Sequence, residues 1–186
     1  MLKKILLGLG AVLALFIAYS GYVLATTRNH SPANEAVYNG SSLSISVQYC
    51  QPYKRDRLIF GSTADGALLP YGVKWRTGAN EANEIEFSND VMISGSVLKK
   101  GRYTLYSIPA ESRWTIAFNN NLDYWGAGIS DPFDESKDAL RVEVPVINTL
   151  DITEQFEISF EELMDNNAIM TFKWDQTQVN VPISKL

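Results

Sequence analysis

A regular alternation of apolar and polar residues is the feature that most limits how this chain can fold. In its clearest run, Leu43, Ile45, Val47 and Tyr49 alternate with polar residues, as expected for a strand with one buried face. About ten such short strands follow one another, with no amphipathic helix and no internal repeat between them. The sequence therefore predicts an all-β fold, an antiparallel β-sandwich with jelly-roll-like connections, over residues 41–186.

The same alternation places the individual strands of the second half. A strand over 73–77, a turn, and a second strand through Ile85 and Phe87 are expected in the middle of the chain. Two strands around a short polar turn predict a hairpin at 102–108 and 113–119. The closing strands are expected over 139–146, 151–160, 168–174 and 177–183.

The N-terminal segment has a different character. Residues 5–25 contain no charged residue, with Lys3 and Lys4 before this run and Arg28 after it. A bilayer-spanning helix needs about 20 apolar residues, whereas the apolar core of a signal peptide has about 7–15. We therefore expect a transmembrane anchor over 5–25, with residues 1–4 in the cytoplasm and the domain on the exported, periplasmic side. Removal as a signal peptide is the alternative, and it also exports the domain.

Residues 26–40 are rich in Thr, Asn, Ser, Pro and Gly, which predicts a flexible linker. This segment holds the single histidine, His30, so neither a Ser-His-Asp triad nor a histidine-based zinc site is expected. Cys50 is the single cysteine and is expected to be a small buried hydrophobe. No P-loop, dinucleotide-binding glycine motif or EF-hand loop occurs, so we expect no cofactor and no metal.

Charge argues against a nucleic-acid partner. The chain has a net charge of −5, and its first 28 residues carry three basic residues and no acidic one. The remainder therefore holds 13 basic against 21 acidic residues, a balance of −8. Such a surface repels a phosphate backbone, and no basic stripe interleaved with aromatic residues offsets it.

The stretch 70–87 has the highest density of polar and aromatic groups in the chain, with an aromatic pair, one arginine, three glutamates and two turn glycines. Small-molecule sites are commonly built from a few oriented polar groups beside aromatic side chains. We therefore expect a site for a small polar or carbohydrate ligand at Tyr71, Trp75, Arg76, Asn80, Glu81, Glu84 and Trp125.

Two other interpretations of these residues are open. In a purely structural one, Arg76 pairs with Glu81 or Glu84 and Asn80 caps the turn, so that the group braces a corner of the fold. In an enzymatic one, Glu81 or Glu84 is the acid of a carbohydrate hydrolase, and Glu86 or Asp123 is its base or nucleophile. We expect a binding or structural module of the cell envelope, with the hydrolase as the alternative.

Several motifs resemble one known family. They are Pro70-Tyr71-Gly72, Trp75-Arg76-Thr77-Gly78-Ala79-Asn80-Glu81-Ala82, Gly101-x-Tyr103-x-Leu105 and Trp125-Gly126. Together they resemble the family called domain of unknown function 2911, over roughly residues 43–183. The resemblance implies an exported bacterial protein, often with a signal peptide or an anchor, and it brings no established activity.

Overall fold

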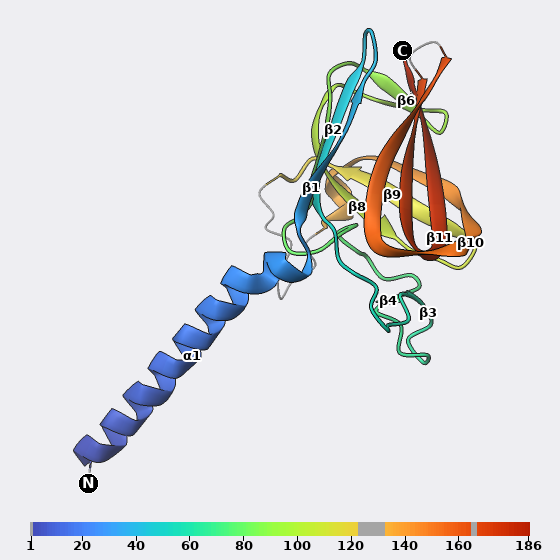
Figure 1. The fold of residues 1–186 in the computed structure, drawn as a ribbon. Helices are drawn as coiled ribbons and strands as arrows, with labels where there is room; N and C mark the ends of the chain where they lie inside the picture. Colours follow the sequence, from blue (N-terminus) through green and yellow to red (C-terminus); the bar gives the residue numbers. More distant parts are fainter. Residues whose placement is uncertain (1, 123–132, 165–166) are drawn as a thin grey trace.

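The computed structural model describes residues 2–122, 133–164 and 167–186, and it places one long helix beside a β-rich domain (Figure 1). The helix is α1 (Leu2–His30). The strands of the first half are β1 (Ala33–Asn39), β2 (Ser44–Cys50), β3 (Phe60–Gly61), β4 (Leu69–Pro70), β5 (Asn83–Phe87), β6 (Val91–Ile93) and β7 (Ser96–Leu98). They are followed by β8 (Gly101–Ile108), β9 (Arg113–Asn119), the short 3-10 helix η1 (Glu135–Lys137), β10 (Asp138–Leu163) and β11 (Asn167–Lys185).

Nine strands form one continuous sheet in the order β1-β2-β5-β8-β9-β10-β11-β6-β7, and its neighbouring pairs are antiparallel. β3 and β4 form a separate parallel pair. The first part of β10, 138–145, pairs with β9, while its later part, 146–163, pairs with β11. Register shifts between Asn148 and Glu157 bend this long hairpin, and residues from both halves of the sheet enter one core.

An aromatic cluster forms the centre of this core. Trp75 makes ring contacts with Phe60, Trp114, Phe156 and Trp174, at centroid distances from 5.0 to 6.0 Å. Edge-to-face and offset pairs at such distances add about 0.5–1.5 kcal/mol beyond the burial of apolar area. The loop that carries Trp75 is thereby packed against β9, β10 and β11 together.

The predicted antiparallel β class is confirmed, as is the hairpin now seen as β8 and β9. β10 and β11 replace the four closing strands, because a bent strand can keep its pairing through a change of direction that the alternation of residues does not reveal. The strand predicted over 73–77 is wrong. In this stretch only Trp75 forms a β-bridge, with Ser107 of β8.

The predicted linker over 26–40 is also corrected. α1 continues to His30, and β1 pairs with β2 along its whole length, from Ala33 opposite Cys50 to Asn39 opposite Ser44. β1 buries only two apolar side chains, Ala36 and Tyr38, and its other residues are exposed. A strand with so few apolar residues has the composition of a linker, which explains the wrong prediction.

The transmembrane prediction over 5–25 falls within α1. Within the residues that the structure describes, no helix combines the length and the apolar composition required to cross a membrane, so this prediction is not confirmed.

Candidate functional site

The loop between β4 and β5 forms the centre of the candidate site. Its residue Trp75 exchanges two backbone hydrogen bonds with Ser107, at N to O distances of 2.7 and 2.8 Å. The chain then turns through Thr77 and Asn80, whose φ angles are 57° and 60°. A left-handed conformation is uncommon for any residue with a side chain and rare for a β-branched one. The turn therefore depends on its surroundings to hold its shape.

Buried hydrogen bonds provide that support. Thr77 has no exposed surface, and its hydroxyl donates to the Ser107 hydroxyl at 3.0 Å. The Thr77 carbonyl accepts a hydrogen bond from Nδ2 of Asn83 at 2.5 Å. The indole Nε1 of Trp75 donates to the carbonyl of Gly78 at 2.9 Å. The turn is therefore fixed from the aromatic core on one side and from β5 on the other.

The turn also packs tightly against the end of β2. A Cβ at Gly78 would lie 2.9 Å from the carbonyl oxygen of Cys50, so the loop backbone and the strand backbone are in direct contact. Oδ1 of Asn83 is buried and has no hydrogen-bond partner among the described residues. A buried acceptor without a hydrogen bond lowers the stability of the fold by about 1–3 kcal/mol. Strained and unsatisfied groups of this kind are concentrated at functional sites in proteins.

The end of α1 is attached to the same turn. A guanidinium nitrogen of Arg28 lies 2.7 Å from Oε1 of Glu81, and Nδ2 of Asn80 donates to the carbonyl of Ser31 at 3.2 Å. Sγ of Cys50 donates to the other carboxylate oxygen of Glu81 at 3.4 Å. Glu81 is thus held by one group from α1 and one from β2.

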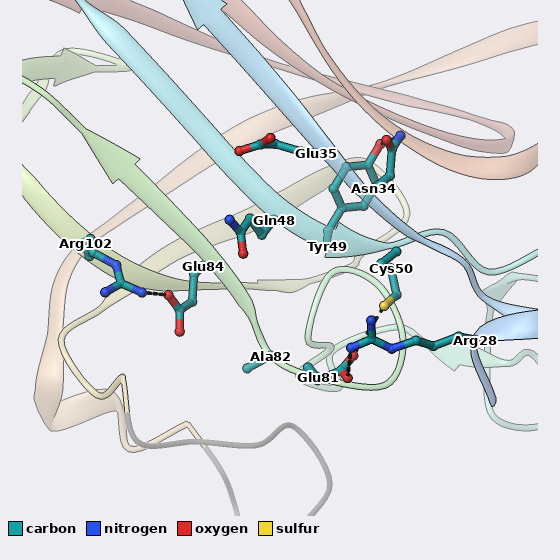
Figure 2. Close-up of a pocket in the computed structure, with 11 residues that line it drawn as sticks. Arg28, Asn34, Glu35, Gln48, Tyr49, Cys50, Glu81, Ala82, Glu84 and Arg102 are labelled. Atoms are coloured by element: carbon teal, nitrogen blue, oxygen red, sulfur yellow. Dashed lines mark hydrogen bonds and ion pairs between the residues drawn. The ribbon is translucent and has the colours of Figure 1, made fainter. Parts of the chain in front are cut away.

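These contacts border an open pocket of about 680 Å³, which we call the charged groove (Figure 2). It is formed by the end of α1, by β1 and β2, by the turn before β5, and by one residue each of β5 and β8. Its lining residues are Arg28, Ala33, Asn34, Glu35, Gln48, Tyr49, Cys50, Glu81, Ala82, Glu84 and Arg102.

Two arginine–glutamate pairs lie in the charged groove (Figure 2). One is Arg28 with Glu81. The other is Arg102 of β8 with Glu84 of β5, a diagonal pair on neighbouring strands. Both glutamate side chains are 35% exposed, and both arginines are more than half exposed. The groove therefore offers hydrogen-bond donors and acceptors that remain in contact with solvent.

Burial acts to raise the pKa of Glu81. The hydrogen bonds from Arg28, from the backbone of Glu81 and from Cys50, together with the charge of Arg28, outweigh burial and leave the pKa below its ordinary value. Burial raises the pKa of the Cys50 thiol. At neutral pH the first group is therefore a carboxylate and the second a protonated thiol.

The structure divides the predicted site residues between two pockets. Glu81 and Glu84 line the charged groove, whereas Trp75, Arg76 and Asn80 line a second pocket of about 460 Å³ on the other side of the turn. Tyr71 is 39% exposed and lines neither pocket.

The predicted roles of Trp75, Trp125 and Asp123 have different outcomes. Trp75 is only 6% exposed and belongs to the core, so it offers little stacking surface. Trp125 and the alternative base Asp123 lie outside the described residues.

The predicted pairing of Arg76 with Glu81 or Glu84 is wrong. Its guanidinium donates to the backbone carbonyl of Asn80, while the two glutamates pair with Arg28 and Arg102. The two left-handed residues of the turn direct Glu81 toward α1, on the far side of the loop from Arg76. Asn80 does stabilise this corner, through its carbonyl and its side chain.

Nine of the eleven residues that line the groove were missed by the sequence analysis, among them Arg28, Gln48 and Arg102. A usable signal exists for two of them. Gln48 lies opposite Glu84 in the β2–β5 register, and Arg102 lies on the outer face of the neighbouring strand. Alternation alone could have placed these side chains on the face of Glu84. Nothing in the sequence pattern brings Arg28 to this face, because the path of the chain after α1 decides it.

Fold and site together define a mostly antiparallel β protein with a charged, solvent-open groove at the end of an N-terminal helix. Within the described residues, no group of three or more His, Cys, Asp or Glu side chains is arranged to hold a metal ion. The chain belongs to the family described as protein of unknown function (DUF2911), whose family model matches residues 31–183. No curated protein and no solved structure shows a significant match to it.

Cys50 is expected to react slowly with thiol reagents in the folded protein. Cys50 is only 4% exposed, and burial raises the pKa of its thiol, so the thiol stays protonated. At pH 7 we expect labelling by a maleimide to be at least about tenfold slower than in the same chain unfolded in urea. Labelling is followed by mass spectrometry. Equal rates in the folded and unfolded states would show that the thiol is accessible and that the burial assigned to Cys50 is wrong.

Proposed function

We propose that this chain is an exported β-sandwich protein of the cell envelope that is attached to the membrane by α1 and binds a small polar or carbohydrate ligand in the charged groove. The observation that carries the binding function is the pair of solvent-accessible arginine–glutamate contacts in one open pocket. Its volume of about 680 Å³ lies within the range of roughly 300–1,000 Å³ typical of ligand sites.

The surface of α1 supports attachment to a membrane. Large apolar side chains on all its sides are exposed, among them Leu13, Leu15, Phe16, Ile17 and Tyr19, each 59–71% accessible. A helix that is apolar all round is normally buried in a protein core or in lipid. The lysines at its start favour a cytoplasmic N-terminus and export of the β-domain.

The chemistry of the groove fits hydroxyl-rich ligands. A sugar hydroxyl donates one hydrogen bond and accepts others, so it is best met by donors and acceptors side by side. The Arg102–Glu84 pair supplies both within hydrogen-bonding distance of each other, and the amide of Gln48 lies beside them on the neighbouring strand. The groove is thereby suited to ligands with several neutral polar groups.

Binding is favoured over hydrolysis by the state of the carboxylates. A general acid needs a carboxyl group that stays protonated near neutral pH, which requires a raised pKa. Burial raises the pKa of Glu81, but the hydrogen bonds it accepts from Arg28, from its own backbone and from Cys50, together with the charge of Arg28, lower it on balance. Glu84 is paired with Arg102. Glu81 is therefore not prepared to donate a proton to a leaving group.

A ligand screen tests the binding function. The full chain in nonionic-detergent micelles is titrated with a panel of oligosaccharides, and binding is followed by saturation-transfer NMR. We expect Glu84→Gln to weaken binding by at least about tenfold, because a hydrogen bond to a charged group is lost.

Glu143→Gln is the matched control for this screen. Glu143 also pairs with an exposed arginine, Arg113, but lies outside the groove, and the loss of either surface pair costs little stability. The proposal fails if no oligosaccharide binds, or if both variants bind as the wild type does. Cell fractionation tests the location, with the chain expected in the membrane fraction.

A further inference from the structure

The second pocket lies on the other side of the turn from the charged groove, and the charged side chains described in its lining are all positive. We call it the arginine pocket; Arg55, Arg57, Arg76 and His30 line it together with apolar residues such as Leu68. Its volume is about 460 Å³, and among the described residues no aspartate or glutamate lines it. Such a concentration of positive charge is unexpected in a chain with a net charge of −5.

The arginines of the arginine pocket differ from the other arginines of the chain in their ion pairing. The sequence contains seven arginines, and four of them, Arg28, Arg102, Arg113 and Arg141, form ion pairs with carboxylates. In the part of the chain that the structure describes, the remaining three have no carboxylate within ion-pair distance of the guanidinium. These three are the arginines of the arginine pocket.

Neutral groups hold these three guanidinium groups in place. Arg57 donates to the carbonyls of Tyr53 and Lys54, and Arg76 donates to the carbonyl of Asn80. The NH2 nitrogen of Arg55 lies 3.0 Å from Nδ1 of His30. The side chains are therefore positioned, while their charges are not neutralised.

Two acidic groups that contact residues of this region, Glu154 and Asp175, are engaged elsewhere. Glu154 accepts a hydrogen bond from the backbone N–H of Arg55 at 2.8 Å, not from its guanidinium. Asp175 pairs with Lys54 at 3.6 Å. Like charges gathered around one pocket repel one another, and an anion between them removes that repulsion.

We propose that the arginine pocket binds a phosphoryl group, carried either by an anionic lipid headgroup or by a soluble phosphate ester. Guanidinium groups match the geometry of phosphate oxygens through paired N–H donors, and three of them can neutralise a doubly charged group. The apolar wall formed by Leu68 and Leu69 would contact the organic part of the ligand. This site lies beyond the charged groove and takes a ligand of different chemistry.

The position of the pocket makes a lipid source accessible to it. His30, the last residue of α1, lines the pocket and contacts Arg55. The segment of β3 and β4 projects from the same end of the β-domain as α1 (Figure 1). Its flanking leucines, Leu58 and Leu68, are 46% and 41% exposed and lie next to each other, since their backbones are hydrogen-bonded.

Titration of the full chain in nonionic-detergent micelles tests the proposal. The probes are inorganic phosphate, glycerol phosphate and phosphatidylglycerol added to the micelles, all at constant ionic strength. Tryptophan fluorescence reports binding, because Trp75 and Trp174 line the pocket. We expect saturable binding that Arg57→Gln and Arg76→Gln each weaken by at least about tenfold, since each removes a charged donor. Arg113→Gln, which removes an arginine outside the pocket, should bind as the wild type does.

Each outcome of this titration has a defined meaning. Binding of the soluble phosphates assigns a soluble ligand, whereas binding of phosphatidylglycerol alone assigns a lipid headgroup. The absence of binding by all three probes, or equal affinity in all variants, would overturn the proposal. If Arg76→Gln fails to fold because it loses its bond to Asn80, Arg57→Gln decides, since that side chain is exposed. The oligosaccharide screen of the charged groove uses other ligands and another variant, so the two proposals can fail separately.

Discussion

Trp75→Ala is expected to lower the free energy of unfolding by about 3–5 kcal/mol. The indole is buried among four other aromatic rings, so its removal leaves a large cavity at the centre of the core. It also leaves the carbonyl of Gly78 without its hydrogen bond from Nε1. Because domains are stable by only about 5–15 kcal/mol, this loss is a large part of the total. Urea denaturation of the full chain in detergent measures it.

Trp75→Phe is the informative companion variant. It keeps an aromatic ring in the cluster but removes Nε1, so its cost should be clearly smaller than that of alanine. A loss below about 1 kcal/mol for Trp75→Ala would mean that the loop is not part of the core. In that case the position assigned here to both pockets would also be wrong.

The second large effect is expected for Gly78→Ala, with a loss of about 1–3 kcal/mol or more. The added Cβ would lie 2.9 Å from the carbonyl oxygen of Cys50 and 3.1 Å from Oδ1 of Asn83. Neither the strand backbone nor the buried amide can move away without breaking other contacts. We expect the turn to shift, so that ligand affinity falls in the charged groove and in the arginine pocket together.

Gly66→Ala separates this steric effect from the general cost of replacing a glycine. Gly66 has a φ of 72° and nothing lies within 4 Å of an added Cβ, so its replacement strains only the local backbone. It should lower stability without changing affinity in either pocket. Denaturation and titration of both variants decide the point, and unchanged affinities in Gly78→Ala would contradict the role given to the turn.

The strands could be predicted from sequence wherever one face is buried and the other is wet. β2 follows this rule, and its position is confirmed. The β8–β9 hairpin is also confirmed, but it was indicated by the polar turn between two apolar strands, since both of its faces are largely buried. β1 could not be found in this way, because it buries only Ala36 and Tyr38 and owes its existence to pairing with β2. The joining of four predicted strands into β10 and β11 was equally hidden, since bends and register shifts leave no mark in a two-residue period.

The stretch predicted to hold the candidate site borders both pockets, but the contacts predicted within it are wrong. Arg76, Glu81 and Glu84 are neighbours in sequence, and pairing among them was the natural expectation. The left-handed Thr77 and Asn80 turn the chain between them, so the carboxylates meet arginines from α1 and β8 instead. The conformation of Thr77 could not be predicted, because threonine rarely adopts it and buried contacts impose it here.

The junction between α1 and β1 is a short, fixed connection and not a flexible tether. Only Ser31 and Pro32 separate the two elements, and proline restricts the chain further. The Ser31 carbonyl is bound by the side chain of Asn80, and Arg28 is bound by Glu81. When α1 is held in place, the β-domain therefore keeps a fixed position and orientation relative to it. The charged groove then opens in one direction relative to the helix axis, so a ligand has a single side from which to approach.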